Sequence, residues 1–209
     1  MWPNNELTEQ LQISLPILQA PMGELSTPAL AAAVSNAGGL GGLGMWAFSV
    51  KEAQQRILDF RKRSHGSLNV NYPLWEERKD AGGLAEEMES NLQALYDAKA
   101  KGPVPPPIFS ESVVDPDHVT MLLNNKPEVI SFHFGLPHQD VIQAIKAADI
   151  PIICSATTVA EAKTLEASGV DFIIAQGTEA GSHQGTFSGA DPLNCAPHHN
   201  PRCQDQALE

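Results

Sequence analysis

The sequence is poor in cysteine, in aromatic residues and in basic residues. Its 209 residues include 3 cysteines and 6% aromatic residues, with 13 lysines and arginines against 25 acidic residues, for a formal net charge of −12. Three cysteines form no paired disulfide framework, which favours a reducing compartment, and we expect the cytoplasm. The negative charge argues against nucleic acid or an anionic membrane surface as the main partner.

Long apolar runs are also missing. No run approaches the roughly 20 residues that a membrane-spanning helix needs, and residues 1–6 lack the basic start and apolar stretch of a signal peptide. With 42% hydrophobic residues, the composition instead predicts a soluble globular protein with a substantial core.

Short β-rich runs alternate with helical stretches over the first 187 residues. The apolar run at 172–175 is typical of a parallel strand that is buried on both faces. The predicted strands are residues 15–22, 39–43, 67–70, 129–134, 150–155 and 172–176. Alternation of this kind predicts a parallel sheet, either doubly wound or closed into a (β/α)₈ barrel.

Local signals mark where the helices between these strands begin and end. Thr27 precedes a proline at the first helical position, and the pairs Ser49 with Glu52 and Thr158 with Glu161 have the spacing of capping boxes. The sequence Asn-Ala-Gly at 36–38 supplies a stop, because glycine readily adopts the left-handed cap conformation.

Two segments depart from the alternation. Residues 73–117 hold a polar helical stretch and a proline cluster, and we interpret them as an insertion between the third and fourth strands. Residues 188–209 show no periodicity, so we predict a domain at 1–187 followed by an irregular tail at 188–209. The tail contains residues of the types that bind zinc, in a spacing that matches no common zinc pattern, and we predict no metal site: Cys195, His198, His199 and Cys203.

The glycine-rich run at 38–44 contains a formal G-x-G-x-x-G. A dinucleotide fingerprint follows a strand and opens a helix, whereas here the first glycines end a helix and the run itself is the predicted strand. We therefore interpret the glycines of this run as allowing close backbone packing and as leaving room for a flat ring at the end of the strand.

Polar and glycine residues gather where the predicted strands end. Met22 and Gly23 follow the first strand, Asn69 ends the third, and His133 lies near the end of the fourth. After the sixth strand, a glycine-rich loop carries Gln176 and His183. Ligands of parallel α/β folds bind outside the carboxyl ends of the strands, and histidine can act as a general base near neutral pH. From the residues alone, a structural role for these groups is as well supported as a catalytic one.

Five motifs in this order and spacing resemble the nitronate monooxygenases, formerly called 2-nitropropane dioxygenases. They are PMG at 21–23, STPALAAAVSNAGGLG at 26–41, FHFGLP at 132–137, CSATT at 154–158 and AQGTEAGSHQG at 175–185. The resemblance covers residues 15–187. One departure is Ser182, where the family more often has glycine, and we expect serine to be tolerated there.

The resemblance implies a TIM-type (β/α)₈ barrel that holds FMN without a covalent bond. Such enzymes oxidise alkyl nitronates, notably propionate 3-nitronate, with O₂ to a carbonyl compound and nitrite. By carry-over, His183 is the catalytic base and His133 lines the substrate pocket. The residues expected to contact FMN are Met22, Gly23, Asn69, Gln176 and Gly181.

The strand count falls short of a complete barrel, which takes about 250 residues and eight strands. Six strands are predicted, so we expect an incomplete barrel without the last two strands, whose loops normally hold the flavin phosphate. We therefore expect weak or absent FMN binding by this chain alone. Two alternatives stay open: another FMN barrel oxidoreductase of the enoyl reductase kind, and a non-catalytic fragment.

Overall fold

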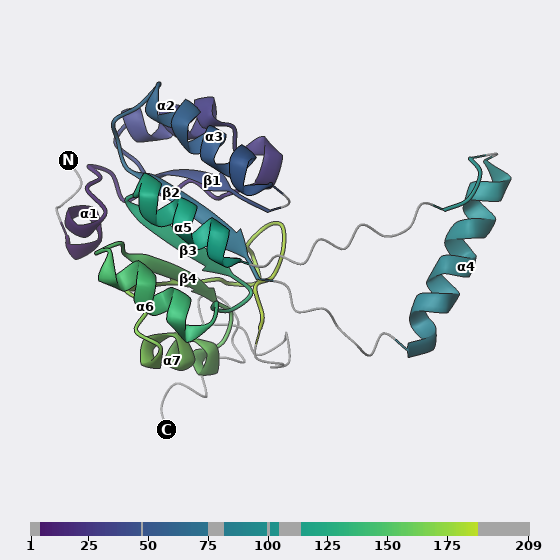
Figure 1. Ribbon diagram of the computed structural model, residues 1–209. Coiled ribbons are helices and arrows are strands. Elements are labelled where there is room, and N and C mark those ends of the chain that lie inside the picture. Colours follow the sequence, from purple (N-terminus) through teal and green to yellow (C-terminus); the bar gives the residue numbers. More distant parts are fainter. Residues whose placement is uncertain (1–4, 47, 75–81, 100, 105–113, 188–209) are drawn as a thin grey trace. The chain divides into compact units, whose positions relative to one another are not determined.

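Five parallel strands form one sheet, and they lie side by side in chain order (Figure 1). The computed structural model describes residues 5–46, 48–74, 82–99, 101–104 and 114–187. The strands are β1 (Gly41–Gly44), β2 (Leu68–Pro73), β3 (Val129–His133), β4 (Ile152–Ala156) and β5 (Phe172–Ala175). The strand order of a doubly wound sheet reverses near its middle, whereas this order runs in one direction. The topology is therefore that of a barrel wall.

The first predicted strand, at 15–22, is wrong in its extent. Leu18 forms only an isolated parallel bridge with Leu40, supported by hydrogen bonds from the Leu40 amide to the Ile17 carbonyl and from the Gln19 amide to the Leu40 carbonyl, both 2.9 Å. Prolines at positions 16 and 21 flank this bridge. Because proline has no amide hydrogen to donate, the ladder does not extend past them.

The connecting helices begin where the capping signals place them. The Thr27 side chain accepts a hydrogen bond from the Leu30 amide at the start of α2, and Ser49 forms a complete capping box with Glu52 at the start of α3. The helices of this part of the chain are α1 (Glu6–Gln10), α2 (Pro28–Asn36), α3 (Val50–Arg61), α5 (Pro116–Asn125), α6 (Gln139–Ala147) and α7 (Val159–Ala167), with a 3₁₀ turn η1 at Gly23–Leu25.

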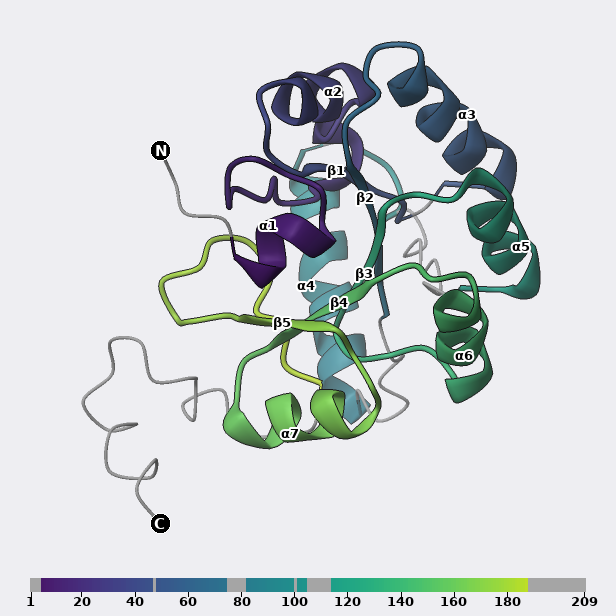
Figure 2. The same cartoon turned by 90° about the vertical axis from the view of Figure 1, so that its left-hand side faces the viewer.

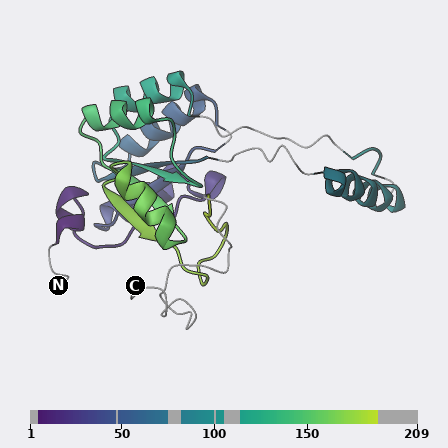
Figure 3. The same cartoon turned by 90° about the horizontal axis from the view of Figure 1, so that it is seen from below.

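Within the unit that contains the sheet, helices α2, α3, α5, α6 and α7 cover one face of the curved sheet, and α1 lies on the other (Figures 2 and 3). The helix-covered face is apolar, with Val70, Ile130 and Phe132 in the main core. On the opposite face, a second cluster closes the amino ends of the strands, and it comprises Leu11, Ile13, Leu40, Val129 and Ile153. The carboxyl half of this inner face is left for polar residues.

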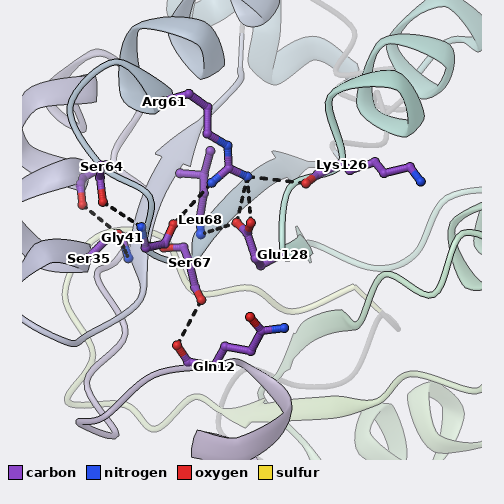
Figure 4. Close-up of polar contacts among 11 residues, drawn as sticks. Gln12, Ser35, Gly41, Arg61, Ser64, Ser67, Leu68, Lys126 and Glu128 are labelled. Carbon is purple, nitrogen blue, oxygen red and sulfur yellow. Dashed lines mark hydrogen bonds and ion pairs between the residues drawn. The ribbon is translucent and has the colours of Figure 1, made fainter.

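A polar network ties the amino ends of β1, β2 and β3 together (Figure 4). Arg61 at the end of α3 forms a 2.9 Å ion pair with Glu128, whose carboxylate also accepts a 2.8 Å hydrogen bond from the amide of Leu68. The Ser35 hydroxyl donates to the Ser67 carbonyl at 2.7 Å and accepts from the amide of Gly41 at 3.1 Å. In barrels of this kind the amino-terminal end serves stability, and these contacts fit that role.

The chain divides into two compact units, residues 1–74 with 112–209 and residues 75–111. The second unit falls within the segment interpreted as an insertion and contains α4 (Gly82–Ala98). Within it, Gln93 donates to Asp97 at 2.7 Å and accepts from the Val104 amide at 3.0 Å. In the described part of the chain, no helix combines the length and apolarity needed to cross a bilayer. The predicted tail and its zinc-type residues lie outside the described residues.

Candidate active site

The inner face of the sheet becomes polar towards the carboxyl ends of its strands. Side chains alternate along a strand, so Asn69 and Asn71 of β2 lie opposite to its apolar residues. Both asparagines are buried, as are Ser131 of β3 and Ser155 of β4. The Asn71 amide nitrogen donates to the Ser131 hydroxyl at 2.9 Å and to its carbonyl at 3.2 Å. Buried polar side chains on neighbouring strands mark this half of the inner face as a candidate ligand site.

Asn69 has an unmatched acceptor. The residue is 6% exposed, and its Oδ1 atom has no hydrogen-bond partner among the described residues. Buried polar atoms in proteins are nearly always paired, so an orphaned acceptor on a polar inner face suits a ligand that donates a hydrogen bond.

His133, at the end of β3, is held in one tautomer by two neighbours. Its Nε2 atom lies 3.3 Å from the carbonyl oxygen of His183, which can only accept, so Nε2 carries the hydrogen. Its Nδ1 atom lies 2.5 Å from the Ser155 hydroxyl. Burial lowers the pKa of His133, and the nearby His183 side chain lowers it further against the opposing effect of the His183 carbonyl. The imidazole is therefore neutral at neutral pH, and Ser155 donates to Nδ1.

Gln176 organises the loop that follows β5. Its side-chain nitrogen donates to the carbonyl of His183 at 3.0 Å, and its side-chain oxygen accepts from the amide of Gly185 at 2.7 Å. A Cβ atom at Gly185 would collide with the imidazole of His133 and lie 3.0 Å from the Ser155 hydroxyl. Only glycine permits this close approach of the loop to β3 and β4.

His183 projects from this loop into an exposed position at the carboxyl end of the sheet. Its ring lies edge-on to Phe134, with ring centroids 6.0 Å apart, and its Nδ1 atom is 3.2 Å from the Ser182 hydroxyl. Ser182 has a φ of 67°, in the left-handed region. That conformation costs a non-glycine residue about 1–2 kcal/mol, which explains why glycine suits this position better.

A second loop, which follows the Leu18 bridge in the chain and lies beside the last residue of β1, carries Met22 and Gly23. The amide of Met22 donates to the buried Ser26 hydroxyl at 2.8 Å. The Arg56 guanidinium donates to the carbonyls of Ser26 at 2.7 Å and Gly23 at 3.3 Å and stacks over Phe48 at 4.3 Å. Met22 remains 44% exposed, so its side chain is accessible to a ligand.

The seven residues chosen from the sequence are not equally close to one another. Hydrogen bonds join Gln176, His133 and His183 directly. Gly181 lies in the same loop, with open space around it. Met22 and Gly23 lie at the β1 edge of the sheet, and Asn69 lies on β2, between that edge and the His183 loop. A shallow cavity of about 220 Å³ in the His183 loop is lined by Gln176, Gly177, Thr178, Ala180, Ser182 and Gln184.

Sequence reasoning missed several polar residues of the site. The missed residues are polar residues of largely apolar strands: Asn71, Ser131 and Ser155. Each lies two positions along the chain from another polar residue. That alternation was the available signal, because it separates the inner face of a strand from its helix-covered face.

Comparisons with known proteins agree with this geometry. The family model for nitronate monooxygenase matches residues 4–197. A nitronate monooxygenase of Paraburkholderia phytofirmans is 41% identical over 181 residues, which are 85% of this chain and 49% of the relative. One from Pseudomonas aeruginosa is 39% identical over 188 residues, which are 88% of this chain and 53% of the relative. The chain thus spans about half the length of the curated relatives it matches.

Solved structures show the same fold. The nitroalkane oxidase of Streptomyces ansochromogenes superposes with a TM-score of 0.77 at 34% identity over 88% of this chain and 52% of that one. FabK from Thermotoga maritima gives 0.64 at 26% identity over 89% of this chain and 48% of that one. The five-stranded sheet is therefore an incomplete TIM-type (β/α)₈ barrel, as expected. With the family model matching most of its length, the chain belongs to the nitronate monooxygenase family.

Proposed function

We propose that this chain forms the flavin- and substrate-binding part of an enzyme that oxidises alkyl nitronates, such as propionate 3-nitronate, with O₂ to a carbonyl compound and nitrite. The observation that carries the proposal is the arrangement of His183, which Gln176 and His133 hold at the carboxyl end of the sheet through its own carbonyl. An imidazole beside a polar inner face, in a member of this family, supports the proposal.

The inner face fits the polar ring of FMN. Asn69 offers a buried, unmatched acceptor among the described residues, and Gln176 still has a second N–H and a second lone pair after its two loop contacts. We propose that these residues, with the backbone at Met22, Gly23 and Gly181, hold FMN. When bound, FMN supplies the redox chemistry, accepting electrons from the substrate and passing them to O₂.

His183 has a different task for each form of the substrate. A neutral nitroalkane must lose the proton on the carbon that bears the nitro group, and the imidazole of His183 accepts that proton. A nitronate has already lost it, so His183 then orients the anion. His133 lines the pocket as a neutral imidazole, because burial lowers its pKa.

The two substrate forms test the role of His183. We expect the full chain with added FMN to release nitrite from propionate 3-nitronate. His183→Ala should slow turnover of neutral nitroethane by about 10²- to 10⁴-fold, the usual contribution of a general base, and should affect the nitronate much less. His138→Ala is the matched control, because His138 is an exposed histidine whose side chain lies 3.3 Å from that of Asp140 at the start of α6.

Equal losses with both substrates would rule out the role of His183 as a base. Consumption of NADPH with an enoyl thioester, without nitrite release from the nitronate, would favour the enoyl reductase alternative. Neither activity together with no thermal stabilisation by FMN would favour the non-catalytic fragment, because a ligand stabilises a folded protein that binds it.

A further inference from the structure

A fully buried carboxylate lies beside the loop that carries His183. Glu161, in the first turn of α7, is 0% exposed. Acidic side chains are almost never completely buried unless hydrogen-bond donors or cations surround them. The partners of Glu161 therefore show what its burial achieves.

Both carboxylate oxygens of Glu161 accept hydrogen bonds from segments outside α7. One oxygen accepts from the amide and the hydroxyl of Thr157, both at 2.8 Å. The other accepts from the amide of Phe187 at 2.7 Å. Because the Thr157 hydroxyl gives its single hydrogen to Glu161, the Thr186 hydroxyl, 2.9 Å away, donates to Thr157. The amino end of α7 also favours a negative charge at this place.

These contacts fasten the far end of the His183 loop to the end of β4. Residues 176–187 contain no helix or strand, so side chains fix the loop's path. Gln176 holds the carbonyl of His183 and the amide of Gly185, and Glu161 holds Phe187. Phe187 also lies beside Gly135, because a Cβ atom added to that glycine would be 3.5 Å from the Phe187 side chain. The loop that carries His183 is thus held at two places, by Gln176 within the loop and by Glu161 at its end.

We propose that Glu161 is a positioning residue, which sets the place of the His183 imidazole by clamping the end of its loop to β4. The catalytic effect of this positioning rests on the proposed function. The attachment of the loop to β4 does not depend on that function. In this role Glu161 acts through its hydrogen bonds with Phe187 and Thr157, and through Thr157 on Thr186.

Glu161→Gln tests the clamp with little change in size. Glutamine has one acceptor oxygen and one NH₂ group, so it can accept a hydrogen bond from the Phe187 amide or from the Thr157 amide but not from both. The amide that is not bonded then faces the NH₂ group, which is itself a donor. We expect amide hydrogen exchange at residues 185–187 to rise about tenfold or more, with exchange in β3 and α6 unchanged. The His183 imidazole resonances should shift and broaden. Glu166→Gln, an exposed position on the same helix, should leave both readouts at their wild-type values.

Thr157→Val is a second variant in case Glu161→Gln folds poorly. It is close in shape and removes only the hydroxyl that joins Glu161 to Thr186, so we expect a smaller rise in exchange that is confined to the end of the loop. Wild-type exchange at residues 185–187 in both variants would overturn the proposal. So would an equal rise throughout β3, β4 and α6, because that pattern indicates general destabilisation.

The kinetic readout separates the clamp from the proposed function. If the wild type releases nitrite, Glu161→Gln should lower kcat with neutral nitroethane by at least about tenfold, with KM changed much less. If the wild type releases none while the exchange pattern is as expected, the proposed function fails and the clamp stands. An unchanged kcat together with a loosened loop would overturn the positioning role.

Discussion

At the scale of single residues, hydrogen-bond partners decide the chemical state of the site. His133 donates from Nε2 to a backbone carbonyl and accepts at Nδ1 from Ser155. A protonated imidazole would have to donate from both nitrogens, and it would be partly buried as well. Both effects favour the neutral ring, in agreement with the lowered pKa of His133.

The lowered pKa of His133 predicts a loss of stability in mild acid. As pH falls through the unfolded-state pKa, near 6.5 for histidine, the unfolded chain gains a proton that the folded chain does not take up. Stability is therefore full above that pH, declines below it, and levels off once the pH has passed the folded-state pKa. Urea unfolding between pH 7 and pH 5 measures the decline. His133→Asn, which keeps a donor and an acceptor, should decline less, and equal slopes for the two proteins would contradict the assignment.

Gly185 gives a second prediction at the residue scale. Alanine at this position would collide with the His133 ring, so we expect Gly185→Ala to destabilise the fold by about 1–3 kcal/mol, the usual effect of overpacking. Gly181→Ala in the same loop is the control for stability, because a Cβ atom there meets nothing within 4 Å. Thermal unfolding compares the two. Equal melting temperatures would mean that the loop moves away from His133 without cost.

At the scale of helices and loops, sequence signals succeed where their partners are near in the chain. The caps at Thr27 and Ser49 join residues three apart, so their pattern can be read directly. The predicted capping box of Thr158 and Glu161 is right only in its N-cap. The Glu161 carboxylate accepts hydrogen bonds from Thr157 and from the amide of Phe187, 26 residues further on, instead of from the Thr158 amide. No local pattern specifies such a contact, which depends on how β4 and the loop meet.

The loop of Met22 and Gly23 depends in the same way on a distant residue, Arg56. Its guanidinium serves two loop carbonyls while it stacks on Phe48, a geometry that lysine cannot reproduce. We expect Arg56→Lys to raise amide exchange in residues 22–26 and to weaken FMN binding by about tenfold, as for the loss of one hydrogen bond from a charged donor. Arg63→Lys, an exposed change near the end of α3, is the control. Unchanged exchange and FMN titration in Arg56→Lys would show that Ser26 alone holds the loop.

At the scale of the whole molecule, the pattern of strands and helices in the sequence does not determine the order of the strands in the sheet. Alternating strands and helices suit a doubly wound sheet and a barrel equally well, because both have the same local periodicity. The resemblance favoured the barrel, and the one-directional order from β1 to β5 confirms it. This order leaves β5 at an edge, where it pairs only with β4 among the described strands.

The exposed edge at β5 predicts self-association of the 209-residue chain. Ile173 and Ile174 point to opposite faces of β5, yet they are 37% and 46% exposed. On the Ile173 side, a groove of about 300 Å³ is lined by apolar and charged residues of α7: Val159, Ala162, Lys163 and Glu166. Unpaired strand edges with apolar side chains capture other chains, and a charge placed on them prevents it. We therefore expect sedimentation velocity to show association that grows with concentration, and Ile174→Lys to reduce it. Leu30→Lys, at a 40% exposed position on α2, should associate like the wild type. Monomers at every concentration, or equal association of the two lysine variants, would show that the β5 edge does not drive it.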